Sequence, residues 1–404
     1  MTFWKMRMSG TNMVMAFLTM LAFSAACFAD TFTHRGTGEL LHGYATSQKD
    51  NGQTTVHTQE KGEVKLNLPN WRTTADRLGR NNKVIVLTLD NQIMLRIEIE
   101  ALIEALTEAA DKGPLFILLE IDTPGGRIDY TKQICSAITR TSNCQVIGFV
   151  KDGKYGGAIS AGAAVALACD KVYMAENTVI GAAALVTLSG SGPKDLKETY
   201  GADLGEKVSS AWRGYLAALA EHKHRPGLIA GAMVDRDVEV IEVSEADKRL
   251  FIDPVNKRPE QQLVHTWSKK GSLLTLTAEE AIKCGIADKL VQSQAEVLRD
   301  LNAQGAQLVI NDAFQKAGEQ FKRVKLRCNR LTKSLESEIR QIKRAPTRNH
   351  AMRLLRDIRK DYKSLMVLAR RYPDLNLDVR VLEEQLNTAE ELYEEAKSES
   401  KFLR

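Results

Sequence analysis

The sequence predicts an α/β domain that is followed by an all-α helical bundle. Between residues 83 and 295, short apolar runs rich in β-branched residues alternate with amphipathic helical stretches. This alternation indicates a largely parallel sheet that is covered by helices. After residue 296, apolar residues recur every seven positions, a spacing typical of helices that pack along a common seam.

Strands and helices of the α/β domain can be placed in chain order. The strands are predicted from apolar runs at residues 84–89, 115–121, 146–150 and 172–174. Helices are expected at residues 95–110, 128–138, from 160 onward and 203–220, whereas residues 235–275 are expected to be β-rich and irregular. Thr277 is expected to cap a further helix, because glutamates follow it in the first turn and Gly285 comes after the last apolar residue.

The segment after residue 296 reads as three helices. Its heptad pattern is broken at Pro346 and Pro373, so we expect an antiparallel helical hairpin or a three-helix coiled-coil bundle. Oligomerisation, partner docking, a basic surface and a plain solvated bundle all remain open as its role. The basic residues near residues 323–330 are read as outer helix faces.

The first 80 residues differ from the rest. Lys5 and Arg7 precede an apolar run that is too short to span a bilayer comfortably, so residues 1–29 are predicted to be a signal peptide cleaved after Ala29. A lipoprotein site at Cys27 and an uncleaved anchor are the alternatives. Residues 30–80 are expected to form a partly disordered extension with one strand at 64–68, which could be a removed prosegment. The predicted domains are therefore 1–29, 30–80, 81–295 and 296–404.

Composition excludes several classes of protein. The chain has 404 residues, is 44% hydrophobic and 26% charged, and carries a net charge of +5, which indicates a globular, mildly basic protein and not a nucleic-acid binder. The cysteines show no CxxC spacing and are read as small buried residues, apart from Cys27 in the predicted signal. We expect neither a metal nor a cofactor.

Two glycine-rich turns are the most informative feature of the chain. Residues 122–126 (Asp122-Thr123-Pro124-Gly125-Gly126) and residues 156–163, which include Ser160, each follow an apolar strand and open a helix. Turns of this kind aim backbone N–H groups at one point, which suits a developing negative charge. The plainer reading is that the glycines only supply unusual backbone angles. The two turns together, in this order, favour a site.

These motifs resemble those of a known fold family. Together with residues 170–175, 178–182, 232–235 and 276–281, they resemble the Clp-protease/crotonase fold over residues 83–295. More closely, they resemble the exported Ser-Lys proteases of that fold, namely the NfeD-type membrane serine proteases and signal peptide peptidase A. The resemblance implies stacked ββα units. That family usually follows the protease with membrane spans and a small β-barrel, whereas here the heptad segment follows.

The resemblance also implies roles for individual residues. Ser160 matches the nucleophile, the N–H groups of Gly126 and Ala161 match the oxyanion hole, and Lys207, 47 positions after Ser160, matches the general base. The turns that hold them contain Gly125, Gly157 and Gly162.

A lysine accepts a proton from serine only when it is neutral, which requires removal of water from its amine. Lys207 is followed on its helix face by Ala211, Gly214 and Ala218, a small-residue face that would let the helix pack closely.

The sequence thus predicts an exported serine endopeptidase of the periplasm or cell envelope, acting on envelope or membrane-derived polypeptides. We expect a polypeptide substrate, a homo-oligomer, a membrane-associated protein partner for the C-terminal helices and no nucleic acid. The main alternative is a catalytically inactive scaffold that binds peptides and uses the helical tail for docking. A Ser-His-Asp triad fits less well because no histidine lies between His57 and His222. Ser160 argues against a crotonase-type acyl-CoA enzyme.

Overall fold

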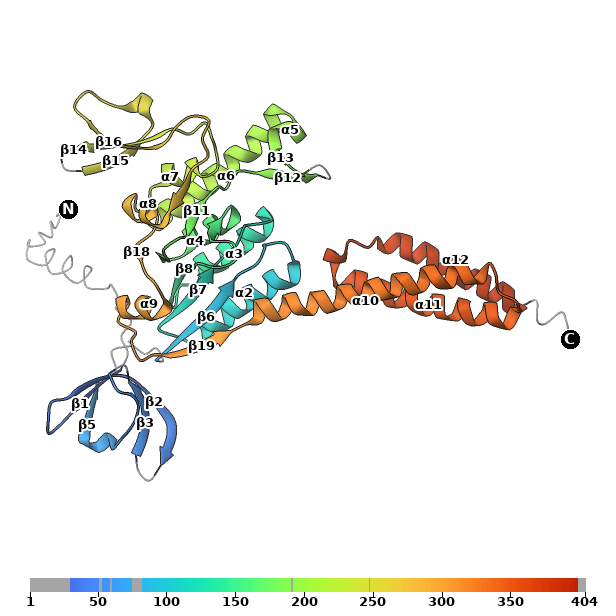
Figure 1. The fold of residues 1–404 in the computed structure, drawn as a ribbon, viewed down its shortest axis with the longest axis horizontal. Coiled ribbons are helices and arrows are strands. Elements are labelled where there is room, and N and C mark those ends of the chain that lie inside the picture. The colour runs from blue at the N-terminus through green and yellow to red at the C-terminus, as the bar shows by residue number, and fades with distance from the viewer. Residues whose placement is uncertain are drawn as a thin grey trace, which may run out of the picture.

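A computed structural model describes residues 30–50, 53–58, 60–74, 82–189, 192–246 and 248–398. A central α/β domain carries a small N-terminal sheet at one end and a long helical tail that projects from its side (Figure 1). The predicted signal peptide lies outside the described residues. Among those residues, no helix combines the length and the apolar character needed to cross a bilayer.

A six-stranded parallel sheet forms the centre of the α/β domain, in the order β18-β10-β8-β7-β6-β19. Alternate residues of its strands enter two separate apolar clusters; Leu87 lies in one and Val86 in the other. Because both faces are covered, the central strands are mostly apolar, as the sequence predicts. The strands are β6 (Lys83–Leu89), β7 (Phe116–Ile121), β8 (Gln145–Val150), β10 (Lys171–Met174), β18 (Lys289–Leu290) and β19 (Gln307–Asn311).

A second, three-stranded sheet lies beyond the carboxyl ends of the central strands. It contains β9 (Gly157–Ile159), β11 (Val179–Gly181) and β17 (Thr275–Thr277), in the order β17-β11-β9. A strand of the large sheet is thus followed by a strand of the small sheet and then, after β9, by helix α4 (Ala161–Ala168). An isolated bridge between Thr123 and Ala158 brings the turn after β7 beside β9. The predicted fold class, stacked ββα units followed by helices, is confirmed.

Some of the remaining elements cover these two sheets, and others extend the domain beyond them. Thr277 caps helix α8 (Ala278–Lys283) in a complete capping box with Glu280, which confirms the predicted N-cap. The other helices of this part of the chain are α2 (Arg96–Asp111), α3 (Ile128–Arg140), α5 (Leu196–Tyr200), α6 (Ala202–His222), α7 (Gly227–Ala232) and α9 (Gln294–Asp300). Strands β12 (Val186–Ser189) and β13 (Gly192–Asp195) form one small antiparallel sheet. A second small antiparallel sheet contains β14 (Val240–Glu245), β15 (Lys248–Ile252) and β16 (Gln262–Ser268), and a 3-10 turn at Pro254–Asn256 lies between β15 and β16.

The N-terminal region is more ordered than the sequence predicts. Only one strand was expected between residues 30 and 80, yet five strands form an antiparallel sheet in the order β4-β3-β2-β1-β5. Its core is small, with Phe32, Leu41, Val56 and Leu66 as the buried apolar residues. With so few apolar residues, the strands show no clear alternation of apolar and polar positions, which is the pattern that would have predicted them. The elements are β1 (Asp30–His34), β2 (Leu40–Asp50), β3 (Gln53–Thr58), β4 (Gly62–Leu66), a 3-10 turn at Leu68–Asn70 and β5 (Trp71–Thr74).

Three long helices form the tail, and the chain leaves the α-helical conformation around Pro346 and Pro373, as predicted. They are α10 (Ala313–Ile342), α11 (Arg348–Arg371) and α12 (Val379–Ser398), and a 3-10 turn spans Pro373–Leu375. Phe321, Cys328 and Leu335 of α10 pack in one apolar cluster with residues of α11 and α12. The helical segment begins at Ala313 and not near residue 296, because β19 pairs with β6. All five described cysteines are buried, as predicted, and no disulfide joins any two of them.

Candidate active site

Ser160 lies in a strained turn between strand β9 and helix α4. Its backbone angles are φ 56° and ψ −119°, a region that non-glycine residues rarely adopt. Such strain costs about 1–3 kcal/mol and concentrates at functional sites. The backbone N–H of Ser160 is held by the carbonyl of Gly181 at 2.7 Å, and its hydroxyl lines a pocket without capping α4. A serine on a sharp strand-to-helix turn is the arrangement of a nucleophile elbow.

Glycine at position 125 lets the two predicted turns approach each other closely. Gly125 has φ +95°, and a Cβ there would lie 2.6 Å from the Ser160 Cβ and 2.8 Å from the Ala161 nitrogen. On the other side of the contact, a Cβ at Gly162 would lie 2.6 Å from the Thr123 side chain, and one at Gly157 would lie 2.1 Å from a carbonyl oxygen of β11. These glycines serve turn geometry, and that geometry brings the residue 122–126 turn against Ser160.

Two N–H groups are available beside Ser160. Gly126 lies between two hydrogen bonds to Ile93, since Ile93 donates to the Gly125 carbonyl at 2.9 Å and Arg127 donates to the Ile93 carbonyl at 2.8 Å. Ala161 is the first residue of α4, where N–H groups have no acceptor inside the helix. Within the described chain, neither the Gly126 nor the Ala161 N–H has a recorded acceptor. Both suit an oxyanion.

The Asp122 carboxylate ties the two turns together. It accepts hydrogen bonds from the backbone N–H of Tyr155, at 3.1 and 3.2 Å, and from that of Gly157 at 3.3 Å. The backbone of Thr123 joins the turns a second time, because its N–H donates to the Gly157 carbonyl at 2.9 Å and its carbonyl accepts from the Ile159 N–H at 3.0 Å. The Thr123 hydroxyl braces the first turn itself, donating to the Asn91 carbonyl at 2.7 Å and accepting from the Gly125 N–H at 3.1 Å. The site is therefore pre-organised by contacts to the backbone.

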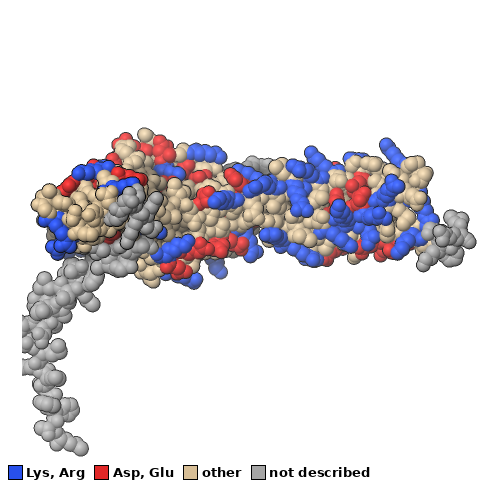
Figure 2. All heavy atoms as spheres, turned by 90° about the horizontal axis from the view of Figure 1, so that it is seen from below, with Lys and Arg blue, Asp and Glu red and all other residues tan. Residues whose placement is uncertain are grey.

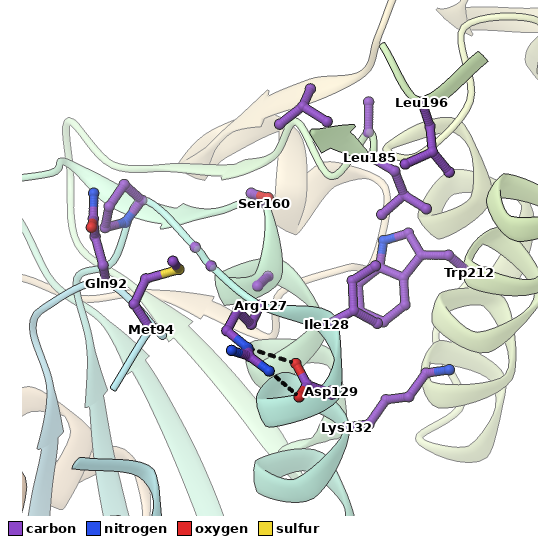
Figure 3. A pocket seen from close by; sticks show the side chains of 16 residues that line it. Gln92, Met94, Arg127, Ile128, Asp129, Lys132, Ser160, Leu185, Leu196 and Trp212 are labelled. Carbon is purple, nitrogen blue, oxygen red and sulfur yellow. Dashed lines mark hydrogen bonds and ion pairs between the residues drawn. The ribbon is translucent and has the colours of Figure 1, made fainter. Parts of the chain in front are cut away.

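The pocket beside Ser160 has a volume of about 760 Å³ and is mostly apolar. Trp212, which the sequence pattern placed only on a helix stripe, forms one wall, and its indole nitrogen donates to the Ala183 carbonyl at 3.0 Å. Trp212, Ile128 and Leu185 lie together on one side and Met94 lies on the other (Figure 3). The remaining lining residues are Gln92, Pro124, Gly125, Gly126, Arg127, Asp129, Lys132, Ser160, Ala161, Ala184, Val186 and Leu196.

The charged residues of the pocket do not contact Ser160. Arg127 pairs with Asp129 at 2.7 Å, and this hydrogen bond lowers the pKa of the Asp129 carboxyl. The exposed Lys132 places its amine 5.2 Å from the Tyr215 ring, pointing toward α6 and away from Ser160 (Figure 3). The described residues that line the pocket include no histidine.

Lys207 is not brought into this pocket. Its side chain is exposed on α6, and it is absent from the pocket lining. The sequence predicted that the small-residue face after Lys207 would pack closely against the domain, and this prediction is wrong. Ala211, Gly214 and Ala218 are exposed, and Gly214 has open space around it. Helix α6 instead buries a neighbouring stripe, which consists of Trp212, Leu216, Leu219 and Ala220. In this conformation the Lys207 side chain is exposed to solvent.

The architecture defines an α/β protein of stacked ββα units. Its serine at position 160 lies in the turn between β9 of the three-stranded sheet and helix α4. Residues 83–258 match the family model described as NfeD1b, N-terminal domain. The resemblance to NfeD-type proteins is thereby confirmed for this part of the chain.

A relative and two solved structures are similar to this chain. Membrane protein NfeD1b of Bacillus subtilis (strain 168) is 29% identical over 204 residues, which make up 50% of this chain and only 38% of the relative. A lysine-to-alanine mutant of the 1510-N membrane-bound stomatin-specific protease, in complex with a substrate peptide, is 22% identical with a TM-score of 0.43, over 58% of this chain and 93% of that chain. The 1510-N membrane protease specific for a stomatin homolog from Pyrococcus horikoshii is 21% identical with a TM-score of 0.36, over 57% of this chain and 92% of that chain.

Proposed function

We propose that the chain is an exported serine endopeptidase that cleaves envelope or membrane-derived polypeptides. Ser160 attacks the scissile carbonyl, and the N–H groups of Gly126 and Ala161 stabilise the resulting oxyanion. The observation that carries the proposal is the strained Ser160 turn, which faces a mostly apolar pocket beside two N–H groups that have no recorded acceptor. An oxyanion donor is typically worth about 10²–10³ in rate.

Lys207 is the proposed general base, on the strength of its position in the family pattern. Because its amine is exposed, the proposal requires that the first turns of α6 change position or become covered. Lys207 lies five residues before Trp212, about 7.5 Å along the helix from a side chain that already lines the pocket. Leu204 and Val208 beside it are 52% and 37% exposed. Burying these apolar side chains would also remove water from the amine and favour its neutral form.

The pocket supports an extended, apolar substrate segment. Its volume of about 760 Å³ and its Trp212, Ile128 and Leu185 wall suit an apolar side chain next to the scissile bond. Location in the periplasm or cell envelope, assembly into a homo-oligomer and docking of a membrane-associated protein partner on the tail are further parts of the proposal, and they rest on the resemblance and the residue pattern.

The test uses the purified chain and an apolar fluorogenic peptide or casein. Cleavage should fall by about 10⁴-fold or more in Ser160→Ala and Lys207→Ala. Lys132→Ala is the matched control, because Lys132 is the exposed lysine that lines the pocket, and this variant should keep most of its activity. Undiminished cleavage by Ser160→Ala would overturn the proposal. Loss in Lys132→Ala with activity kept in Lys207→Ala would assign the base to Lys132.

The exposed Lys207 favours one second candidate, a peptide-binding scaffold without catalysis. In that case the pocket binds an apolar peptide, but Ser160 is not activated. A fluorophosphonate separates the two functions, since it reacts with an activated serine and not with an ordinary one. Peptide binding without labelling at any pH between 6 and 9 would favour the scaffold.

A further inference from the structure

Helix α10 carries a stripe of cations along its outer face. The positions alternate by three and four residues, so they share one side of the helix. Four of the six are Lys or Arg and none is acidic, and they lie opposite the seam of Phe321, Cys328 and Leu335. The basic stripe consists of Arg323, Leu326, Arg330, Lys333, Ser337 and Arg340.

The cations of the basic stripe are exposed and form no recorded ion pair among the described residues. All four are exposed, and among the residues that the structure describes none of the four takes part in a recorded ion pair. The acidic helix α12 neutralises α11 instead, because Glu390 accepts from Arg359 at 3.3 Å and from Lys363 at 2.9 Å. On the face of the molecule that Figure 2 shows, Lys and Arg side chains are spread along the tail with some Asp and Glu among them, and both signs are mixed over the α/β domain.

A solvated helix face does not by itself explain this pattern. Residues 322–344 contain nine Lys or Arg and two Glu. Like charges three or four positions apart on a helix repel one another and weaken the helix. The basic stripe runs about 26 Å along α10, which is about three Debye lengths at physiological salt. Its cations therefore act on any large partner as a line of charge.

We propose that the basic stripe docks the protein onto a membrane surface rich in anionic phospholipid. The charges are complementary, and the straight tail can lie along a flat surface. Leu326 is 56% exposed within the stripe and Ile339 is 41% exposed beside it, so apolar side chains accompany the cations. That combination is typical of helices at the membrane interface. Residues 322–344 contain no aromatic residue, the side chain on which nucleic-acid bases stack.

The test is sedimentation of the full chain with vesicles of phosphatidylcholine alone or with 40% phosphatidylglycerol. We expect binding to the anionic vesicles only, and weaker binding at higher salt. A cation near such a surface is worth about fivefold in affinity, so the triple variant Arg323→Glu, Arg330→Glu, Lys333→Glu should bind at least about 100-fold more weakly. The control is Lys257→Glu, Lys269→Glu, Lys270→Glu, which makes the same change in net charge at exposed sites of the α/β domain. It should bind as the wild type does.

Several results would overturn the assignment. These are no binding to anionic vesicles at 150 mM salt, full binding by the stripe variant, or equal loss in both variants. Tighter, stripe-dependent binding to a 30-base-pair DNA than to vesicles would assign the stripe to nucleic acid. Circular dichroism and melting of both variants verify folding, which glutamate should preserve because its helix propensity is close to that of arginine and lysine.

Discussion

Replacing Gly125 with alanine tests the contact between the two turns. The new Cβ would lie 2.6 Å from the Ser160 Cβ, whereas ordinary contacts begin at 3.4 Å, so the turns must separate by about 0.8 Å. The Gly126 N–H would move with them. A misplacement of about 1 Å can cost 10² in rate, and a lost oxyanion donor about 10²–10³. We predict that Gly125→Ala lowers the rate of fluorophosphonate labelling by about 10²–10³.

Gly156→Ala is the control for backbone strain. Gly156 also has positive φ, +74°, but a Cβ there would meet nothing within 4 Å. Gly156→Ala should lose about 1–2 kcal/mol of unfolding free energy, because alanine disfavours this conformation, and Gly125→Ala should lose at least as much, because its Cβ also clashes. Only Gly125→Ala should lose labelling. A wild-type labelling rate in Gly125→Ala, or an equal loss in both variants, would refute the reasoning.

Three further predictions concern stability. Trp212→Ala should lower the free energy of unfolding in urea by about 3–5 kcal/mol, because the side chain is only 3% exposed; a loss below 1 kcal/mol would contradict its buried place. Burial raises the pKa of Glu98 to about 7 from 4.5. The folded state then holds the proton more tightly, so unfolding free energy should fall as pH rises from about 4.5 through 7, and Glu98→Gln should remove that fall. An unchanged pH profile in the variant would exclude Glu98 as the cause. Thr277→Ala removes the hydrogen bond from the Glu280 N–H, 3.2 Å long, and should cost about 1 kcal/mol in a thermal melt; an unchanged melt would show that this cap does not limit stability.

The central strands could be predicted because the signal for each strand lies within its own few residues. Strands β6, β7, β8 and β10 are buried on both faces, so each is a mostly apolar run between turns. The two turns that meet at Ser160 were also placed correctly beside each other. Both follow a strand and open a helix, and such turns gather at the carboxyl edge of a parallel sheet.

The rest depended on contacts between distant segments. The heptad pattern does not reveal that β19 precedes the tail and pairs with β6, more than 200 residues earlier. Periodicity on α6 identified residues that share a face but not which face the domain covers, so Lys207 was expected on a buried face and lies on an exposed one. Trp212 was recognised as apolar, yet its place in the pocket wall follows from how α6 crosses α4 and could not be read from spacing.

Mapping the fluorophosphonate adduct by mass spectrometry tests the central claim most directly. The account predicts one adduct on Ser160, none in Ser160→Ala, slow labelling in Lys207→Ala and normal labelling in Lys132→Ala. An adduct on another residue, or a wild-type protein that cleaves peptides while Ser160 stays unlabelled, would contradict it.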